Sequence, residues 1–136
     1  INSTGNLNIT GIPFQPSQVS FVAHANIESL NINSDNGSGN NFNGIPNAFG
    51  TMNGFAREEN GAITQQVIYV GGNGTSINDI SRYASSAECI GIRYSNQNGD
   101  NIGVTSASLS AFNPDGFTLT VGSNADNLVV LYQAYQ

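Results

Sequence analysis

The sequence has no lysine and no tryptophan, and its 136 residues include one cysteine and one histidine. Charged residues make up 9% of the chain, and the net charge is −6. Binding to nucleic acid or to an anionic membrane requires clustered cations, and here three arginines are the only permanent ones. No apolar run approaches the roughly 18 residues of a membrane-spanning helix. The composition therefore argues against nucleic acid and membranes as partners.

A single cysteine, Cys89, excludes an internal disulfide and a cysteine-based metal cage. It lies in a mostly apolar run, so we expect a buried and inert thiol. The chain length is close to the usual size of one domain and is sufficient for a hydrophobic core without covalent cross-links. We therefore expect residues 1–136 to form a single domain that does not depend on disulfides.

What the chain does have is asparagine, its most frequent residue, together with glycine-rich turns between short extended runs. The sequence Asn113-Pro114-Asp115-Gly116 predicts a hairpin in which Gly116 takes a positive φ. Asn60-Gly61 and the segment 96–100 predict two further hairpins. The extended runs are expected at 6–12, 19–25, 28–33, 49–57, 62–70, 88–95, 102–112, 117–121 and 128–135.

These patterns predict an all-β protein, namely an antiparallel β-sandwich of jelly-roll or Greek-key type with about eight strands. Pro13 and Pro16 indicate a sheet edge or a crossover between strands. Residues 34–48 predict a long exposed loop. The segment Ile77–Ser86 is compatible with either one helical turn or an irregular crossover.

Candidate catalytic groups are few. A histidine-centred triad would have to be built on His24, but the sequence contains no Gly-x-Ser-x-Gly motif to supply a nucleophile. Glu58 and Glu59 are adjacent, and on a strand adjacent side chains point to opposite faces, so they do not form the convergent carboxylate pair of a glycosidase. The sequence therefore predicts that the protein is not an enzyme, with no catalytic residue and no cofactor.

Calcium is a weaker candidate ligand. Acidic and amide side chains are close together at 35–37, 98–101 and 124–127, and Ca²⁺ prefers six to eight oxygen ligands. Each segment offers one carboxylate, so a calcium site would require two of these loops to converge.

Four residues are candidates for an interface or a ligand contact: Phe42, His24, Tyr132 and Tyr135. Phe42 is an isolated aromatic residue in a polar segment, so it either folds back onto the domain or marks a contact surface. His24 is predicted to lie on the strand face opposite the core, as a surface or interface histidine.

Several short motifs, taken in order, resemble a group of bacteriophage virion domains found in head or tail structural proteins. They are Ile12–Val22, Asn53-Gly54-Phe55-Ala56, Gln65-Gln66-Val67, Arg82 followed by Cys89-Ile90-Gly91-Ile92, and Ser108–Leu119. The resemblance implies a β-sandwich that decorates a capsid or fibre on the virion surface. It would bind copies of itself and a major capsid or tail protein, and would catalyse no reaction.

The beginning and end of the chain also resemble the H-type lectin fold, a small sandwich that oligomerises and binds sugars of the N-acetylgalactosamine type. The resemblance implies a carbohydrate-binding adhesion domain with surface glycans as partners. The absence of tryptophan and the long insertion at 34–61 depart from that family, so this function is the alternative.

Overall fold

The computed structural model describes residues 1–30 and 44–136, and within these ranges the chain forms nine strands and no helix. The strands are β1 (Gly5–Ile9), β2 (Gln18–His24), β3 (Ala48–Glu59), β4 (Ala62–Asn73), β5 (Ser76–Ser85), β6 (Ile90–Ser95), β7 (Asn101–Asn113), β8 (Gly116–Asn124) and β9 (Val130–Tyr135). The predicted all-β class is confirmed, and the nine strands compare with about eight that were predicted.

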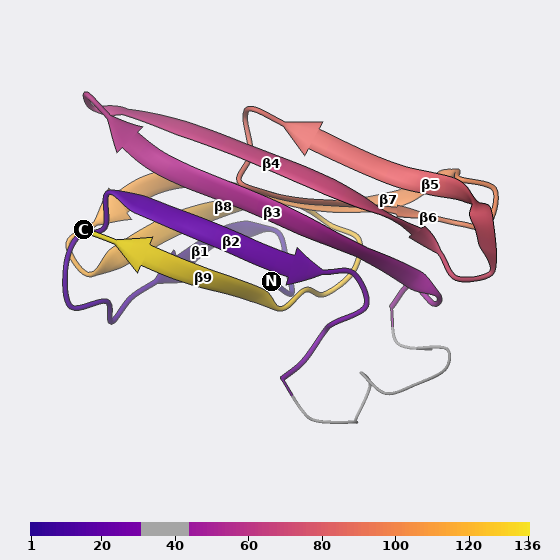
Figure 1. Cartoon of the computed structure of the whole chain (residues 1–136). Coiled ribbons are helices and arrows are strands. Elements are labelled where there is room, and N and C mark those ends of the chain that lie inside the picture. Colours follow the sequence, from indigo (N-terminus) through magenta and orange to yellow (C-terminus); the bar gives the residue numbers. More distant parts are fainter. Residues whose placement is uncertain (31–43) are drawn as a thin grey trace.

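The strands form two antiparallel sheets that pack face to face (Figure 1). One sheet has four strands in the order β1-β8-β7-β6, and the other has five in the order β5-β4-β3-β2-β9. Consecutive strands from β2 to β5 and from β6 to β8 are neighbours, so each sheet is mainly a meander. Only β1 beside β8 and β9 beside β2 join strands distant in sequence. The segment with Pro13 and Pro16 connects β1 of one sheet to β2 of the other, which confirms the predicted crossover.

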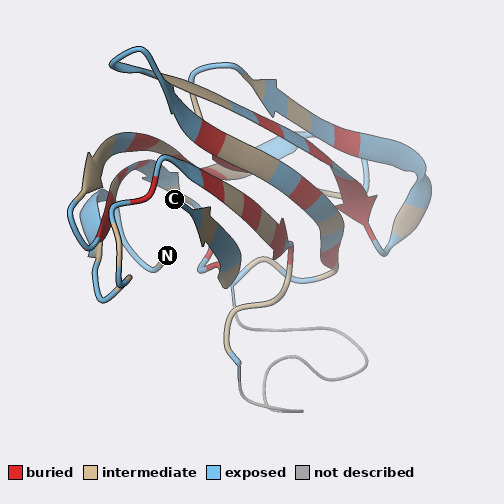
Figure 2. Ribbon diagram, turned by 60° about the vertical axis from the view of Figure 1, so that its left-hand side comes forward, coloured by how far each residue is buried: buried red, intermediate tan, exposed pale blue. Residues whose placement is uncertain are grey.

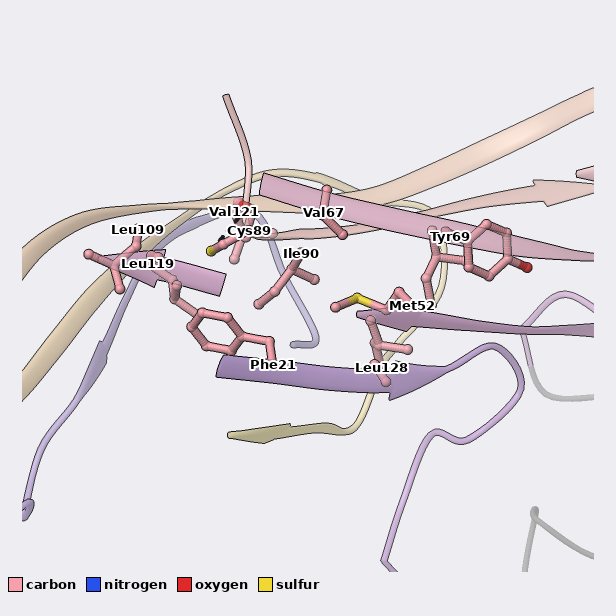
Figure 3. Packing of buried hydrophobic residues seen from close by; sticks show 14 of the residues in the cluster. Phe21, Met52, Val67, Tyr69, Cys89, Ile90, Leu109, Leu119, Val121 and Leu128 are labelled. Atoms are coloured by element: carbon pink, nitrogen blue, oxygen red, sulfur yellow. Dashed lines mark hydrogen bonds between the residues drawn. The ribbon is translucent and has the colours of Figure 1, made fainter. Parts of the chain in front are cut away.

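The core lies between the two sheets (Figure 3). On β2, Val19, Phe21 and Ala23 are buried while the residues between them are not, as the alternation of the sequence predicts. Figure 2 shows this alternation as bands along the strands of the five-stranded sheet. The Phe21 ring packs edge-on against Phe117 of the opposite sheet, with 5.9 Å between ring centroids. The two sheets therefore share one apolar interior.

Three of the predicted turns are confirmed. Asn60 and Gly61 both have positive φ and connect β3 to β4, as in a type I′ hairpin. Residues 96–100 connect β6 to β7, and Asn113 pairs with Gly116 at the β7–β8 turn. The reason predicted for Gly116 was wrong, because Gly116 is not among the positive-φ residues. A Cβ atom there would lie 1.8 Å from the carbonyl oxygen of Ile9, so glycine is required by the close approach of β1.

Three segment predictions need correction. Ile77–Ser86 is neither a helical turn nor an irregular crossover, because nearly all of it belongs to β5, which pairs with β4. Glu28–Leu30 lie in no strand, and the rest of the run predicted at 28–33 lies outside the described residues. Of the loop predicted at 34–48, only residues 44–48 are described, and Ala48 is already the buried first residue of β3.

Candidate functional site

Of the four predicted contact residues, the three that the structure describes do not converge on one site. Phe42 lies outside the described residues. His24 is exposed at the end of β2, with its ring Nδ1 3.0 Å from the hydroxyl of Thr51. Tyr135 of β9 is paired with Gln18 at the other end of β2, which places it about 20 Å from His24 along the strand.

Tyr132 and Tyr135 lie on opposite faces of β9, because they are three residues apart on a strand. Tyr132 points toward the four-stranded sheet, and its ring packs edge-on against Phe117 at 5.2 Å. Tyr135 points away from the core and donates a hydrogen bond to the side-chain oxygen of Gln133 at 2.9 Å. The two tyrosines therefore cannot contact the same small ligand.

Three other titratable groups, Cys89, Glu59 and Tyr83, are either buried or hydrogen-bonded to neighbouring side chains. Cys89 is fully buried, as predicted, and burial raises the pKa of its thiol to about 12. Hydrogen bonds from Thr64 and Arg57 lower the pKa of Glu59. Tyr83 donates a hydrogen bond to Glu88, and burial is the main reason that the pKa of Tyr83 rises to about 12.

Within residues 1–30 and 44–136, no three histidine, cysteine, aspartate or glutamate side chains are grouped as metal ligands. The loops at 98–101 and 124–127 thus bring no such group together, and the third segment proposed for calcium, at 35–37, lies outside these ranges. The same part of the chain has no helix long and apolar enough to cross a membrane.

The most distinctive surface is the outer face of the five-stranded sheet. Cross-strand pairing places a row of outward-pointing residues across it: Leu131, Val22, Asn53, Ile68 and Ala84. Ile68 is 64% exposed and Leu131 is 60% exposed. We define the apolar face as Val22, Phe49, Phe55, Ile68, Val70, Ile80 and Leu131, which lie at outward-pointing positions of all five strands.

The apolar face is hollowed on both sides of the Asn53–Ile68 pair. One hollow of about 230 Å³ is lined by residues that include Phe55, Gln66 and Ile68. A second hollow of about 210 Å³ is lined by residues that include Thr51, Ile68 and Val70. Ile68 therefore stands between two depressions, and apolar side chains of a partner protein would fit beside it.

The same face carries little charge. By alternation along the strands, its outward-pointing charged residues are Arg57, Glu59 and Arg82. Arg57 and Glu59 form an ion pair at 2.7 Å, and the Arg57 guanidinium lies 5.3 Å from the centroid of the Phe55 ring. Both members of this pair lie toward the β3–β4 turn, and Arg82 lies on the edge strand β5 opposite Val70. The row through Val22, Asn53 and Ile68 therefore carries no charge.

The outer face of the four-stranded sheet is different. Thr118 donates a hydrogen bond to the Asn8 side chain at 2.9 Å and accepts one from Asn113 at 2.9 Å. Thr120 donates to Asn6 at 3.1 Å. These side chains satisfy one another and are compatible with water.

The sequence analysis missed the apolar face, although β4 contained a signal for it. Val67-Ile68-Tyr69-Val70 is a continuous apolar run, and such a run is typical of a strand that is apolar on both faces. Val67 and Tyr69 are buried in the core, whereas Ile68 and Val70 are exposed on the outer face.

Fold and surface together define an all-β sandwich with an exposed apolar face on its five-stranded sheet. No protein-family model matches the chain, and no curated protein and no solved structure matches it either.

Proposed function

We propose that this chain is a non-enzymatic structural module of a virion surface, which decorates a capsid or fibre through protein contacts. The apolar face is the observation that carries the proposal. Soluble monomers rarely expose a contiguous apolar patch of more than a few hundred Å², and larger patches usually mark interaction sites. The resemblance of the sequence motifs to phage virion domains is the reason for proposing a virion as the assembly to which the chain binds.

The outer side of the five-stranded sheet is close in size to a protein interface. A strand residue occupies about 16 Å² of a sheet, so the whole outer side, with its polar positions included, measures about 750 Å². A stable, specific interface buries about 800 Å² on each partner. A major capsid or tail protein that covered this side of the sheet would therefore bury an area typical of a specific interface, with the apolar face inside it.

The charge distribution also supports docking through this face. Burying an unpaired charge in an interface is costly, and the cores of interfaces are depleted in charged residues. The row through Val22, Asn53 and Ile68 has none, the Arg57–Glu59 ion pair is already formed toward the β3–β4 turn, and Arg82 lies on the edge strand β5. A partner would therefore displace water mainly from apolar and amide groups.

A carbohydrate-binding role is the second candidate, and one surface feature favours it. A polar hollow of about 480 Å³ is lined by residues that include Gln15, Glu58, Asn60 and Gln136. Amides and carboxylates of this kind bind sugar hydroxyls, but a sugar site also usually has an aromatic ring to stack on, and no tyrosine lines this hollow. Binding on a glycan array that is abolished by free sugar would favour this candidate over the first.

The proposal is tested by adding the purified chain to virus particles that lack it and measuring how much sediments with them. We expect the native chain to bind and Ile68→Lys to bind at least tenfold less, because the substitution places a charge between the two hollows. Thr120→Lys is the matched control, since it puts the same charge at an exposed strand position on the polar sheet. Absence of binding by the native chain, or equal binding by Ile68→Lys, would overturn the proposal.

A further inference from the structure

The edge strands of the two sheets make different contacts on the two sides of the sandwich. The sheet edges on one side are β5 and β6, and those on the other side are β1 and β9 (Figure 1). Between β5 and β6, Ser81 donates a hydrogen bond to the carbonyl oxygen of Arg93, and the Arg93 guanidinium donates back to the Ser81 hydroxyl at 3.0 Å. The first side is therefore sealed by direct hydrogen bonds between the sheets.

The β5 and β6 edges also carry features that prevent further strand pairing. The pairing of β5 with β4 shifts at Gly72/Asn73, and the pairing of β6 with β7 shifts at Tyr94/Ser95. Charged residues lie on both strands: Asp79 and Arg82 on β5, and Arg93 on β6. Bulges and charges are the usual means by which edge strands avoid pairing with other chains.

Strand β9 has none of these features. Val130–Tyr135 contains no charged residue, proline or glycine, and it pairs with β2 in a regular register from Ala23↔Val130 to Gln18↔Tyr135. In the described part of the chain, its other edge has no neighbouring strand in the sheet. Tyr132 and Tyr135 are 42% and 46% exposed. An uncharged, regular and apolar edge of this kind is a template for another strand.

The gap between the sheets beside β9 is apolar as well. A hollow of about 120 Å³ opens there and is lined by apolar residues of β1, β2, β8 and β9, among them Leu7, Phe117, Val130 and Tyr132. Small-molecule pockets usually measure about 300–1,000 Å³. This hollow is smaller, and its size suits a single apolar side chain from a neighbouring protein.

We propose that β9 pairs with β9 of a second copy, antiparallel across a two-fold axis at Gln133, so that the two five-stranded sheets become one continuous sheet. Paired residues point to the same face of a sheet, so partners in the two copies of β9 must be an even number of residues apart in sequence. The axis must therefore pass between two copies of the same residue. With Gln133 at the axis, Leu131 lies opposite Tyr135 on the outer face and Tyr132 lies opposite Ala134 on the inner face. Each exposed apolar side chain of the strand then has an apolar partner.

A second copy is favoured over another protein because the strand is complementary to itself. The chain has a net charge of −6, so most contacts between copies would bring like charges together. At this edge, β9 has no charge and the adjacent β2 has only His24 as a titratable side chain. The inference rests on and extends the proposed function, because pairing through β9 involves only Leu131 of the apolar face and leaves its other six residues free to bind the particle.

The test is cross-linking of single-cysteine variants of the whole chain under mild oxidation. Gln133→Cys should form a disulfide-linked dimer, because the two thiols would lie directly opposite each other at the axis. Leu131→Cys is the matched control on the same face of the same strand. Its two copies would lie about 13 Å apart along the strands, too far for a disulfide. Native Cys89 is fully buried and does not interfere. Equal cross-linking of both variants, or none by Gln133→Cys, would overturn the inference.

A second variant separates this inference from the proposed function. Gln133→Lys places two like charges at the axis, and we expect at least a tenfold weaker dimer in sedimentation equilibrium. Ile77→Lys, at a residue that is 88% exposed on β5, should dimerise like the native chain. If Gln133→Lys dimerises normally, the inference is wrong even if particle binding persists. If the native chain dimerises through β9 but binds no particle, the proposed function fails and this inference stands.

Discussion

The two sheets share one core but present opposite outer faces to their surroundings. On the four-stranded sheet, Thr118 and Thr120 are hydrogen-bonded to Asn8 and Asn6 of the neighbouring strand. On the five-stranded sheet, outward-pointing strand positions are occupied by Ile68, Val70 and Leu131, whose side chains are all more than half exposed. The polar side chains on the four-stranded sheet are satisfied by one another, whereas the five-stranded sheet leaves apolar side chains exposed to water.

This difference separates a surface whose side chains are satisfied within the domain from the surface that would make the proposed contact. A face of mutually hydrogen-bonded side chains gains nothing from a cover, because its polar groups are already satisfied. An exposed apolar row gains about 25 cal/mol for each Å² removed from water. We therefore expect substitutions on the polar face to change the free energy of unfolding and not binding. Substitutions on the apolar face should change binding and not the free energy of unfolding.

The largest effect is expected in the core that the two sheets share. Phe117 is fully buried and packs against Phe21 and Tyr132 of the other sheet. We expect Phe117→Ala to lower the free energy of unfolding by about 3–5 kcal/mol, because it removes a large buried ring and leaves a cavity. Urea denaturation measures this loss. A change below about 1 kcal/mol would mean that the sheets do not depend on one core.

A smaller effect is expected on the polar face. Thr118→Ala removes the hydroxyl that joins Asn8 and Asn113 across three strands, and we expect a loss of about 1 kcal/mol in the free energy of unfolding. The matched substitution on the apolar face is Ile68→Thr, which keeps a β-branched side chain and should change stability by less than about 0.5 kcal/mol. If Ile68→Thr is the more destabilising of the two, the apolar face contributes to the fold and the comparison fails.

Much of the fold was predictable because its signals are local. Asn60-Gly61 and Asn113-Pro114-Asp115-Gly116 specify hairpins within a few residues, and the alternation in Val19–Ala23 marks the buried face of β2. The assignment of β5 failed because Ile77 and Ile80 are spaced by three residues, as on a helix, and only pairing with β4 shows the strand. Gly116 was predicted as a turn glycine, but the reason for it is the carbonyl oxygen of Ile9, more than a hundred residues away in sequence.

The candidate surface was less predictable, since it depends on register between strands. Leu131, Val22 and Ile68 become neighbours in a row only when β9, β2, β3 and β4 are aligned, and β9 is separated from β2 by most of the chain. Tyr132 and Tyr135 were predicted to be contact residues only because they are aromatic residues near the end of the sequence. The structure places them on opposite faces of β9, where they serve different contacts in the proposed pairing.

The proposed attachment of this chain to a virion through its apolar face is tested most directly by cryo-electron microscopy of virus particles that carry the chain. The account predicts density for this chain at symmetric surface positions, with Ile68 and Val70 covered by a shell or fibre protein and Thr118 and Thr120 facing solvent. Density in which the chain is attached through the polar face, with the apolar face open to solvent, would contradict it.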